Sequence, residues 1–186
     1  MAKKVIFQAV AERTMSEKGI EIYLDEEMKK DFRQTQWDNY YEPIAKEAIT
    51  ETFGFKIKEV GAAVVSDIFS TSPDGLIKDG DPIEIKCPYD PIKHEYSLSL
   101  ETDVERGHEY FWQMQAHIYA LSEVTGKRVE RCHFFSYDPR RSGTDNLVHF
   151  VCERDDDAIE EMKQKLHQAE VIIKKRLDVG VYDFDV

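Results

Sequence analysis

The sequence predicts an α/β fold in which a central mixed β-sheet is flanked by helices. Three observations support this prediction: apolar residues recur at helical spacing in three separate stretches, runs rich in β-branched residues lie between them, and no internal repeat or low-complexity linker divides the chain. The order helix, strands, helix, strands, helix is typical of a sheet covered by helices. The 186 residues can bury a substantial core, so we expect one domain over residues 1–186.

The first half of the chain is expected to contain one helix followed by extended segments. The helix is expected over residues 37–53, because residues that can form one face of a helix recur there at helical spacing: Tyr40, Ile44, Ala48, Ile49 and Thr52. Gly54 should end this helix, and Pro43 either kinks it or begins a new one. Residues 82–87 are dense in β-branched residues and predict a strand. Residues 55–57 and 60–65 are also expected to form strand, and residues 66–70 and 74–78 are expected to be extended.

The second half is expected to contain two further helices and two strands. Residues 89–101 are rich in Tyr, His and Lys and are expected to form a loop. A long helix is expected over 103–123, with an apolar face made of Tyr110, Met114, Ile118 and Leu121. Strands over 129–137 and 147–152 should be joined by a turn. Asp155 is expected to cap the last helix, which should end before Gly180.

Composition excludes several classes of protein. The chain carries 25 Lys and Arg against 37 Asp and Glu, a net charge of −12, which argues against coating nucleic acid by bulk charge. The three cysteines are far apart, so neither a disulfide framework nor a zinc site is expected. This cysteine content fits a protein of the reducing cytoplasm. No stretch approaches a membrane span, so no membrane contact is expected. The histidines lack metal-binding spacing and are expected to be structural or exposed: His94, His108, His117, His133, His149 and His167.

Two short segments, SPDGL at 72–76 and IEIKCP at 83–88, predict a hairpin with converging polar side chains. Glu84 and Lys86 are two residues apart, so they project from the same face of a strand. Asp74, just before a glycine turn, can lie beside them. Two carboxylates can hold a hard cation, and the lysine lies where an attacking water would be oriented or deprotonated. An ordinary hairpin with solvated charges is the alternative, because such spacing arises easily in a chain that is 33% charged.

Three further features could serve such a site. Glu42, on the first predicted helix, could add a third carboxylate and allow a second cation, or it could simply face solvent. Gln113 and Gln115 face different sides of a helix, so one can orient the lysine or the water while the other is structural or exposed. Arg140 and Arg141 follow Tyr137-Asp138-Pro139 and could contact DNA phosphate, or the segment could be a turn without function.

Taken together, these segments resemble the lambda-exonuclease family, also called the YqaJ-like viral recombinase nucleases, within the PD-(D/E)xK superfamily. The resemblance covers about residues 37–177 and is carried by Trp37 with Glu42, SPDGL, EIKCP, Tyr110 with the QMQ segment, and YDPR at 137–140. It implies a restriction-endonuclease-like core. It also implies that two divalent metal ions are bound, normally Mg²⁺, with Mn²⁺ as a substitute. Their ligands would be Asp74, Glu84 and the backbone carbonyl of Ile85, with Glu42 in support.

The resemblance implies roles and partners as well. Lys86 would activate or position the attacking water, Gln113 rather than Gln115 would orient Lys86 or the nucleophile, and Ser72 would bind the 5′-terminal phosphate. Such enzymes degrade one strand of duplex DNA from the 5′ end and leave a 3′ overhang for a single-strand annealing recombinase. They form ring-shaped homotrimers around double-stranded DNA ends. A phage or prophage origin, and hence the host-cell cytoplasm, is implied.

The N-terminal region departs from the family pattern. Residues 1–36 are shorter than the usual region before the core, and the family's W-x-x-x-R-x-G segment, which helps to hold the 5′ phosphate, is not visible. Lys4, Arg13 or Arg33 could replace it, and Lys93 is the nearest match to the basic residue that follows the family's E-x-K lysine. We therefore expect a shortened region over 1–36, a family-like core over 37–177 and an acidic tail over 178–186.

Other interpretations stay open at this level. A structure-specific endonuclease of the same superfamily would cut covalently closed circular DNA, which an exonuclease must leave intact. A non-catalytic DNA-end-binding module would keep the fold without hydrolysis, although the complete set of acids and lysine argues against this. A small metal-binding protein of unrelated function is disfavoured by the QMQ and YDPR segments. We expect a Mg²⁺-dependent deoxyribonuclease that acts 5′→3′ on duplex ends.

Overall fold

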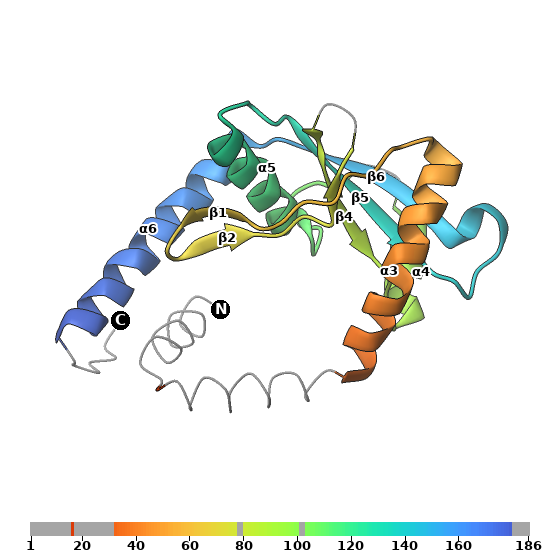
Figure 1. Ribbon diagram of the computed structural model, residues 1–186, viewed down its shortest axis with the longest axis horizontal. Coiled ribbons are helices and arrows are strands. Elements are labelled where there is room, and N and C mark those ends of the chain that lie inside the picture. Colours follow the sequence, from red (N-terminus) through yellow and green to blue (C-terminus); the bar gives the residue numbers. More distant parts are fainter. Residues whose placement is uncertain (1–15, 17–31, 78–79, 101–102, 180–186) are drawn as a thin grey trace. The chain divides into compact units, whose positions relative to one another are not determined.

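A computed structural model of the chain describes residue 16 and residues 32–77, 80–100 and 103–179 (Figure 1). The chain divides into two compact units. One unit is Phe32–Ile159, which contains all the strands described below. The other consists of Met1–Asp31 and Glu160–Val186, of which the described part is residue 16 and most of the last helix, α6 (Asp156–Val179). Within the described residues, no helix combines the length and the apolar character needed to cross a membrane.

A mixed four-stranded sheet forms the centre of the larger unit, in the order β3-β4-β5-β6. Strands β4 and β5 are parallel, and the other neighbours are antiparallel. This confirms the predicted fold class. The strands are β3 (Gly75–Leu76), β4 (Pro82–Lys86), β5 (Arg131–Tyr137) and β6 (Leu147–Glu153), and a separate antiparallel pair is made of β1 (Ala63–Ser66) and β2 (Phe69–Thr71).

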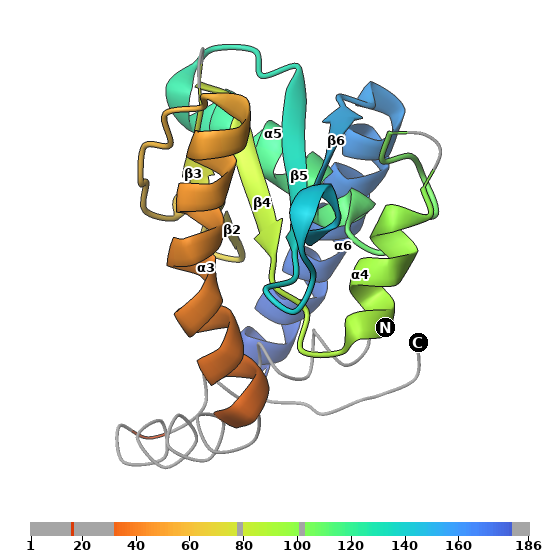
Figure 2. The same ribbon diagram turned by 90° about the vertical axis from the view of Figure 1, so that its right-hand side faces the viewer.

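Helices cover both faces of the sheet (Figures 1 and 2). On one face, α3 (Phe32–Phe53) packs Ala45 and Ile49 against the side chains of Ile83 and Ile85. On the other face, α5 (Phe111–Thr125) packs Met114 and Ile118 against Phe134. Side chains alternate along a strand, so the two isoleucines of β4 face α3 while the residue between them faces α5. A central strand buried on both faces is mostly apolar, which makes a buried acid on β4 conspicuous.

The first helix differs from its predicted form in bounds and in phase. It begins at Phe32 rather than Trp37, and it continues through Pro43, which is exposed. Tyr40 was expected on the buried face but is 66% exposed, whereas Tyr41 packs against the core. The extended segments after the helix are also shorter than expected: only an isolated bridge pairs Lys58 with Leu76 before β1 begins.

The predicted loop over 89–101 was wrong in part, because Pro91–Leu98 forms a helix, α4. Asp90 caps this helix: its side chain accepts a hydrogen bond from the backbone N–H of Ile92 at 3.0 Å. Pro91 occupies the first helical position, where its missing N–H has no consequence. This start signal was present in the sequence and was overlooked among the polar residues around it.

We expect Asp90→Ala to lower the free energy of unfolding by about 1 kcal/mol, because removing an N-cap leaves a backbone donor of α4 without its acceptor. For a chain of this length the melting temperature should fall by roughly 2–4 °C. Thermal unfolding, monitored by circular dichroism, would measure the change in melting temperature. Glu123→Ala, on the exposed surface of α5, is the matched control. Equal melting temperatures for both variants and the wild type would show that the cap does not stabilise the helix.

The long helix begins later than predicted, at Phe111 instead of residue 103. The preceding segment follows β6: the N–H of Val104 donates to the carbonyl of Val151 at 2.9 Å, and the N–H of Val151 donates to the Asp103 carboxylate at 2.9 Å. Gly126 ends α5 in the left-handed conformation, with φ of 67°. The predicted cap of α6 is confirmed, since Asp155 accepts a hydrogen bond from the N–H of Ala158 at 2.8 Å.

Candidate active site

Strands β3 and β4 bring Asp74, Glu84 and Lys86 together. Asp74 directly precedes β3, and its N–H donates to the carbonyl of Ile83 on β4 at 3.0 Å. Its Oδ2 accepts a hydrogen bond from the backbone N–H of Ile85 at 2.6 Å, which holds the carboxylate at the edge of β4. Glu84 and Lys86 project from one face of the same strand and form an ion pair. The predicted convergence of two acids and a lysine is therefore present.

Glu84 is the centre of this cluster. Its side chain is only 2% exposed, and both carboxylate oxygens are engaged. Oε1 accepts from Lys86 Nζ and, at 2.9 Å, from Gln113 Nε2 on α5. Oε2 lies 2.7 Å from Nε2 of His117, one turn further along the same helix. A buried carboxylate requires such partners, and three donors supply them here.

The two glutamines of the QMQ segment serve different places, as helical geometry requires. Gln113 is largely exposed and meets Glu84. Gln115 is fully buried: its Nε2 donates to the carbonyl of Glu153 at 2.7 Å, and its Oε1 accepts from the N–H of Asp155 at 3.0 Å. Gln115 thus ties α5 to the end of β6 and stands apart from the cluster around Glu84.

Sequence reasoning missed two side chains that border the cluster. His117 was grouped with structural or exposed histidines, yet it contacts Glu84 directly. Its signal was its position four residues after Gln113, which places both on one helix face. Asp38 was not considered. It lies four residues before Glu42 on α3, and the charges of Lys86 and Glu42 both act on its carboxyl.

Glu42 lies near the cluster without joining its hydrogen bonds in the described structure. Its Oε1 pairs with Lys46 one turn along α3 at 2.7 Å. Its negative charge nevertheless acts on the Asp74 carboxyl. The charges of two residues of α3 thus act on the cluster, Glu42 on Asp74 and Asp38 with Lys86, while Gln113 and His117 contact Glu84 from α5.

The charges of the cluster shift the pKa values of its members. Burial, and then the negative charge of Glu84, raise the pKa of Asp74 to about 7, against the hydrogen bond from Ile85. Burial alone would raise the pKa of Glu84, but the hydrogen bond from His117 and the charge of Lys86 lower it overall. Burial opposes the charged form of Lys86, but the adjacent Glu84 raises the pKa of Lys86 overall. Two neighbouring carboxylates with opposite shifts are typical of functional sites.

The donor set around Asp74 and Glu84 suits a hard divalent cation, which prefers oxygen ligands. In an extended strand the N–H and C=O of one residue point to the same edge, so the carbonyl of Ile85 lies on the edge where its N–H meets Asp74. Burial and the charge of Glu84 raise the pKa of Asp74, which means that the ionised carboxylate is destabilised there; a bound cation would stabilise it. Within the described residues, no three His, Cys, Asp or Glu side chains form a metal-binding group by themselves.

The three residues predicted to contact phosphate differ in their exposure and in their partners. Ser72 is exposed, two residues before Asp74 and next to the cluster. Arg140 instead holds the buried carboxylate of Asp138 with Nε at 2.7 Å and Nη2 at 2.9 Å, and donates to the carbonyls of Pro88 and Tyr89 at 3.0 Å each. Arg141 pairs with Glu95 on α4. Arg140 thus joins the β5–β6 turn to the loop after β4.

Arg140→Ala is expected to lower the free energy of unfolding by about 2–3 kcal/mol, because the buried Asp138 carboxylate would lose its cation. Arg141→Ala is the matched control and should change it by less than about 1 kcal/mol, since its pair with Glu95 is exposed. Chemical denaturation of both variants measures the difference. If Arg140→Ala kept full stability and instead weakened DNA binding, Arg140 would be a phosphate contact rather than a structural link.

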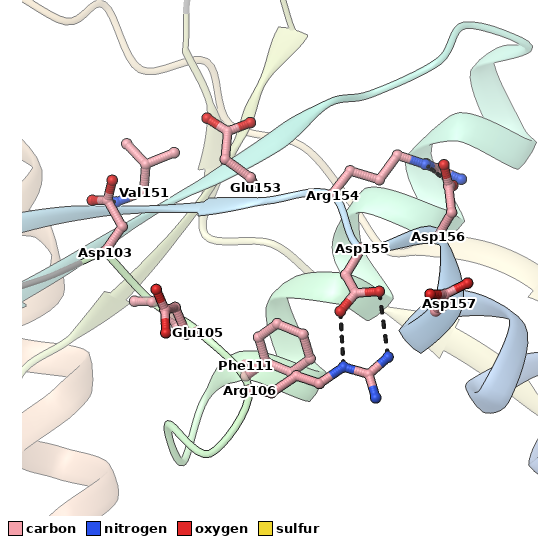
Figure 3. Close-up of a pocket in the computed structure, with 11 residues that line it drawn as sticks. Asp103, Glu105, Arg106, Phe111, Val151, Glu153, Arg154, Asp155, Asp156 and Asp157 are labelled. Carbon is pink, nitrogen blue, oxygen red and sulfur yellow. Dashed lines mark hydrogen bonds and ion pairs between the residues drawn. The ribbon is translucent and has the colours of Figure 1, made fainter.

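A separate cleft of about 660 Å³ lies between β6, the start of α6 and the segment before α5 (Figure 3). Its two arginines are paired with carboxylates: Arg106 Nε donates to Asp155 at 2.8 Å, and Arg154 Nε donates to Asp156 at 2.7 Å. Its other lining residues are acidic or apolar: Asp103, Val104, Glu105, Phe111, Val151, Glu153 and Asp157. This surface is poorly suited to phosphate, and none of the clustered residues around Glu84 lines it.

The basic residues considered as replacements for the family's phosphate-binding segment lie in different parts of the chain. Lys4 and Arg13 lie outside the described residues, and Arg33 lies in α3 with its side chain outside the description. Lys93 is on α4, where its Nζ pairs with Glu109 at 3.2 Å and lies 5.9 Å from the ring centre of Tyr110. The ring of Tyr110 also faces Lys86, whose Nζ is 5.0 Å from its centre.

Comparisons with known proteins give a consistent picture. The family model described as the YqaJ-like viral recombinase domain matches residues 5–128. An alkaline exonuclease (LHK-Exo) from Laribacter hongkongensis is 25% identical, with a TM-score of 0.66 over 91% of this chain and 87% of that chain. Its complex with dAMP has the same identity and coverage and a TM-score of 0.63.

A phage related exonuclease from Haemophilus somnus 129PT is 13% identical, with a TM-score of 0.63 over 80% of this chain and 74% of that chain, and is similar in fold alone. No curated protein matches the sequence. The family match begins at residue 5, so it includes most of the segment before Trp37 and extends beyond the cluster around Glu84.

Proposed function

This chain belongs to the YqaJ-like viral recombinase domain family, and from that premise we propose that it is a metal-dependent deoxyribonuclease that degrades duplex DNA from its ends. The observation that carries the proposal is the cluster itself: a buried Glu84 bonded to Lys86 and Gln113, beside an Asp74 fixed to the same strand. Its similarity to a protein described as an alkaline exonuclease supports the choice of an exonuclease over other nucleases.

We assign the cation, Mg²⁺ with Mn²⁺ as a substitute, to Asp74, Glu84 and the carbonyl of Ile85. Glu42 would support a second ion after releasing Lys46, and the acid beside it, Asp38, adds negative charge on the same side. When bound, such cations neutralise charge on the scissile phosphate and lower the pKa of a water molecule. Asp74 must be ionised for this, so its raised pKa ties cation binding to pH.

The chain's own groups would position the substrate and the water. Lys86 is held beside Glu84 and is charged at neutral pH, because its pKa is raised. A bound cation would lower the pKa of Lys86 again, so we assign Lys86 to orienting or activating the attacking water and to stabilising charge on the phosphate. Gln113 fixes Glu84 from α5 and is exposed enough to meet the DNA backbone as well.

The direction of digestion and the assembly belong to the same proposal. Ser72 is exposed and two residues from Asp74, which suits a hydroxyl that receives a 5′-terminal phosphate. Removal of nucleotides from that end would leave 3′ single strands, the substrate of a single-strand annealing recombinase. We propose a homotrimer around the duplex, acting in the host-cell cytoplasm, as the family resemblance implies.

Digestion of linear duplex DNA, labelled separately at its 5′ and 3′ ends, tests this function. With Mg²⁺ we expect early release of the 5′ label, no release in EDTA, and a covalently closed circle left intact. Early release of the 3′ label would reverse the polarity. Cutting of the circle would identify an endonuclease, and binding to ends without any cutting in Mg²⁺ or Mn²⁺ would identify a non-catalytic module.

A further inference from the structure

We propose that His117 is a positioning residue that orients Glu84 to bind its cation through Oε2, and that Thr71 in turn holds His117. The inference rests on the proposed function, because it concerns the same cation. Its evidence is a buried chain of side chains across three elements. Thr71 on β2 contacts His117 on α5 at 2.6 Å, and His117 contacts Glu84 on β4 at 2.7 Å.

A count of hydrogen bonds identifies which oxygen of Glu84 has an unused acceptor direction. A carboxylate offers about four acceptor directions, two on each oxygen. Oε1 already accepts from Lys86 and Gln113, so both of its directions are used. Among the residues that the structure describes, His117 is the one donor to Oε2. The remaining direction is therefore on the oxygen that His117 holds, and Glu84 would bind a cation through that single oxygen.

The orientation of the His117 ring follows from its partners. The Glu84 carboxylate is paired with the ammonium of Lys86 and acts as an acceptor, so Nε2 of His117 carries the hydrogen that it donates. Nδ1 then faces the Thr71 hydroxyl, which can donate to it. The ring is 1% exposed and is bonded at both nitrogens, so it has one defined position. Hydrogen bonds of this kind fix the rotation of a carboxylate ligand.

The same chain links Glu84 to the loop that contains Asp74. Thr71 is the last residue of β2, and Asp74 follows three residues later. Because Thr71 is tied to α5 through His117, the start of this loop and the carboxylate of Glu84 are fixed to one helix. The two proposed ligands therefore keep their spacing before a cation arrives, which is the arrangement expected of a preorganised site.

Two substitutions at residue 117 separate positioning from simple packing. The side-chain amide of His117→Gln can reach about as far as Nε2 and keeps a donor for Glu84. The amide of His117→Asn lies near the position of Nδ1, so it can meet Thr71 but falls short of Glu84. Mn²⁺ affinity, measured by calorimetry on the full chain at fixed pH, should fall about 10–100-fold in His117→Asn and within a few fold in His117→Gln.

Activity at increasing Mg²⁺ gives a second readout. The loss in His117→Asn should be recovered in large part at saturating Mg²⁺, because the defect lies in binding the cation and not in the chemical step. Thr71→Val keeps the shape of the side chain and removes only its hydroxyl; it should weaken Mn²⁺ binding in the same direction. It also serves as the test if His117→Asn does not fold.

Three outcomes would overturn the inference: Mn²⁺ affinity in folded His117→Asn equal to the wild type, equal losses in the Asn and Gln variants, or unchanged affinity in Thr71→Val when His117→Asn does not fold. A wild type that binds no Mn²⁺ would refute the cation site of the proposed function and this inference with it. Wild-type binding and digestion, together with a neutral His117→Asn, would refute the inference alone.

Discussion

Lys86→Ala is expected to lower the rate of DNA hydrolysis by about 10²–10⁴-fold while duplex binding stays within a few fold of the wild type. The ammonium is held beside Glu84 and above the ring of Tyr110, with 29% of the side chain exposed, so it can face a bound phosphate. Its removal takes a positioned charge from the reaction but leaves the three proposed cation ligands in place. Single-turnover hydrolysis measures the rate, and fluorescence anisotropy with Ca²⁺ in place of Mg²⁺ measures binding.

Lys165→Ala is the matched control for this experiment, because that lysine is on α6 and pairs with Glu161 on its own helix. Both variants lose one positive charge, so any effect of net charge on DNA binding is shared. A Lys86→Ala variant that retained more than about a tenth of the wild-type rate would remove Lys86 from the mechanism.

Asp74→Asn is expected to abolish hydrolysis and, at the same time, to make the protein more stable at pH 8 without divalent cations. The pKa of Asp74 is raised from 3.8 to about 7, first by burial and then by the charge of Glu84. A raised pKa means that the folded state holds the proton more tightly than the unfolded state. The resulting stability is complete below about pH 3.8 and is lost as the pH rises through about 7.

At pH 8, therefore, the ionised Asp74 opposes folding and a neutral amide does not. The gain in Asp74→Asn should be on the order of 2 kcal/mol, or roughly 4–8 °C in melting temperature. Mg²⁺ should raise the melting temperature of the wild type at pH 8 but not that of the variant, and the effect on the wild type should shrink toward pH 6. A variant that is less stable than the wild type at pH 8, in the absence of divalent cations, would contradict the cost of the buried Asp74 charge inferred here.

The local part of the site could be predicted from the sequence because it depends on strand alternation. Glu84 and Lys86 had to share one face of a strand wherever that strand lay. Asp74 lies beside them because Gly75, directly after it, begins β3 and pairs with Ile83 on β4, rather than because of a glycine turn. The choice between Gln113 and Gln115, and the contact of His117, depend on how α5 is rotated against the sheet. That rotation is set by the packing of Met114 and Ile118, which a single sequence does not fix.

The features that the sequence did not reveal have similar causes. The helix α4 was overlooked because its start, Asp90 followed by Pro91, is surrounded by residues typical of loops. Arg140 was considered for phosphate binding because two adjacent arginines occur in an acidic chain, and that contact stays a prediction; its structural role was not foreseen. Its partners include two backbone carbonyls about 50 residues earlier in the chain, at Pro88 and Tyr89, and such distant contacts leave no local pattern.

The central claim is that Asp74, Glu84 and the carbonyl of Ile85 hold the cation on which hydrolysis depends. The most direct measurement is a crystal structure of the wild type grown with Mn²⁺, with anomalous data to locate the metal. We predict an anomalous peak about 2.0–2.3 Å from oxygens of these three residues, and its loss in Asp74→Asn. A peak confined to the acidic cleft of Figure 3, or none beside β4 at saturating Mn²⁺, would contradict the account.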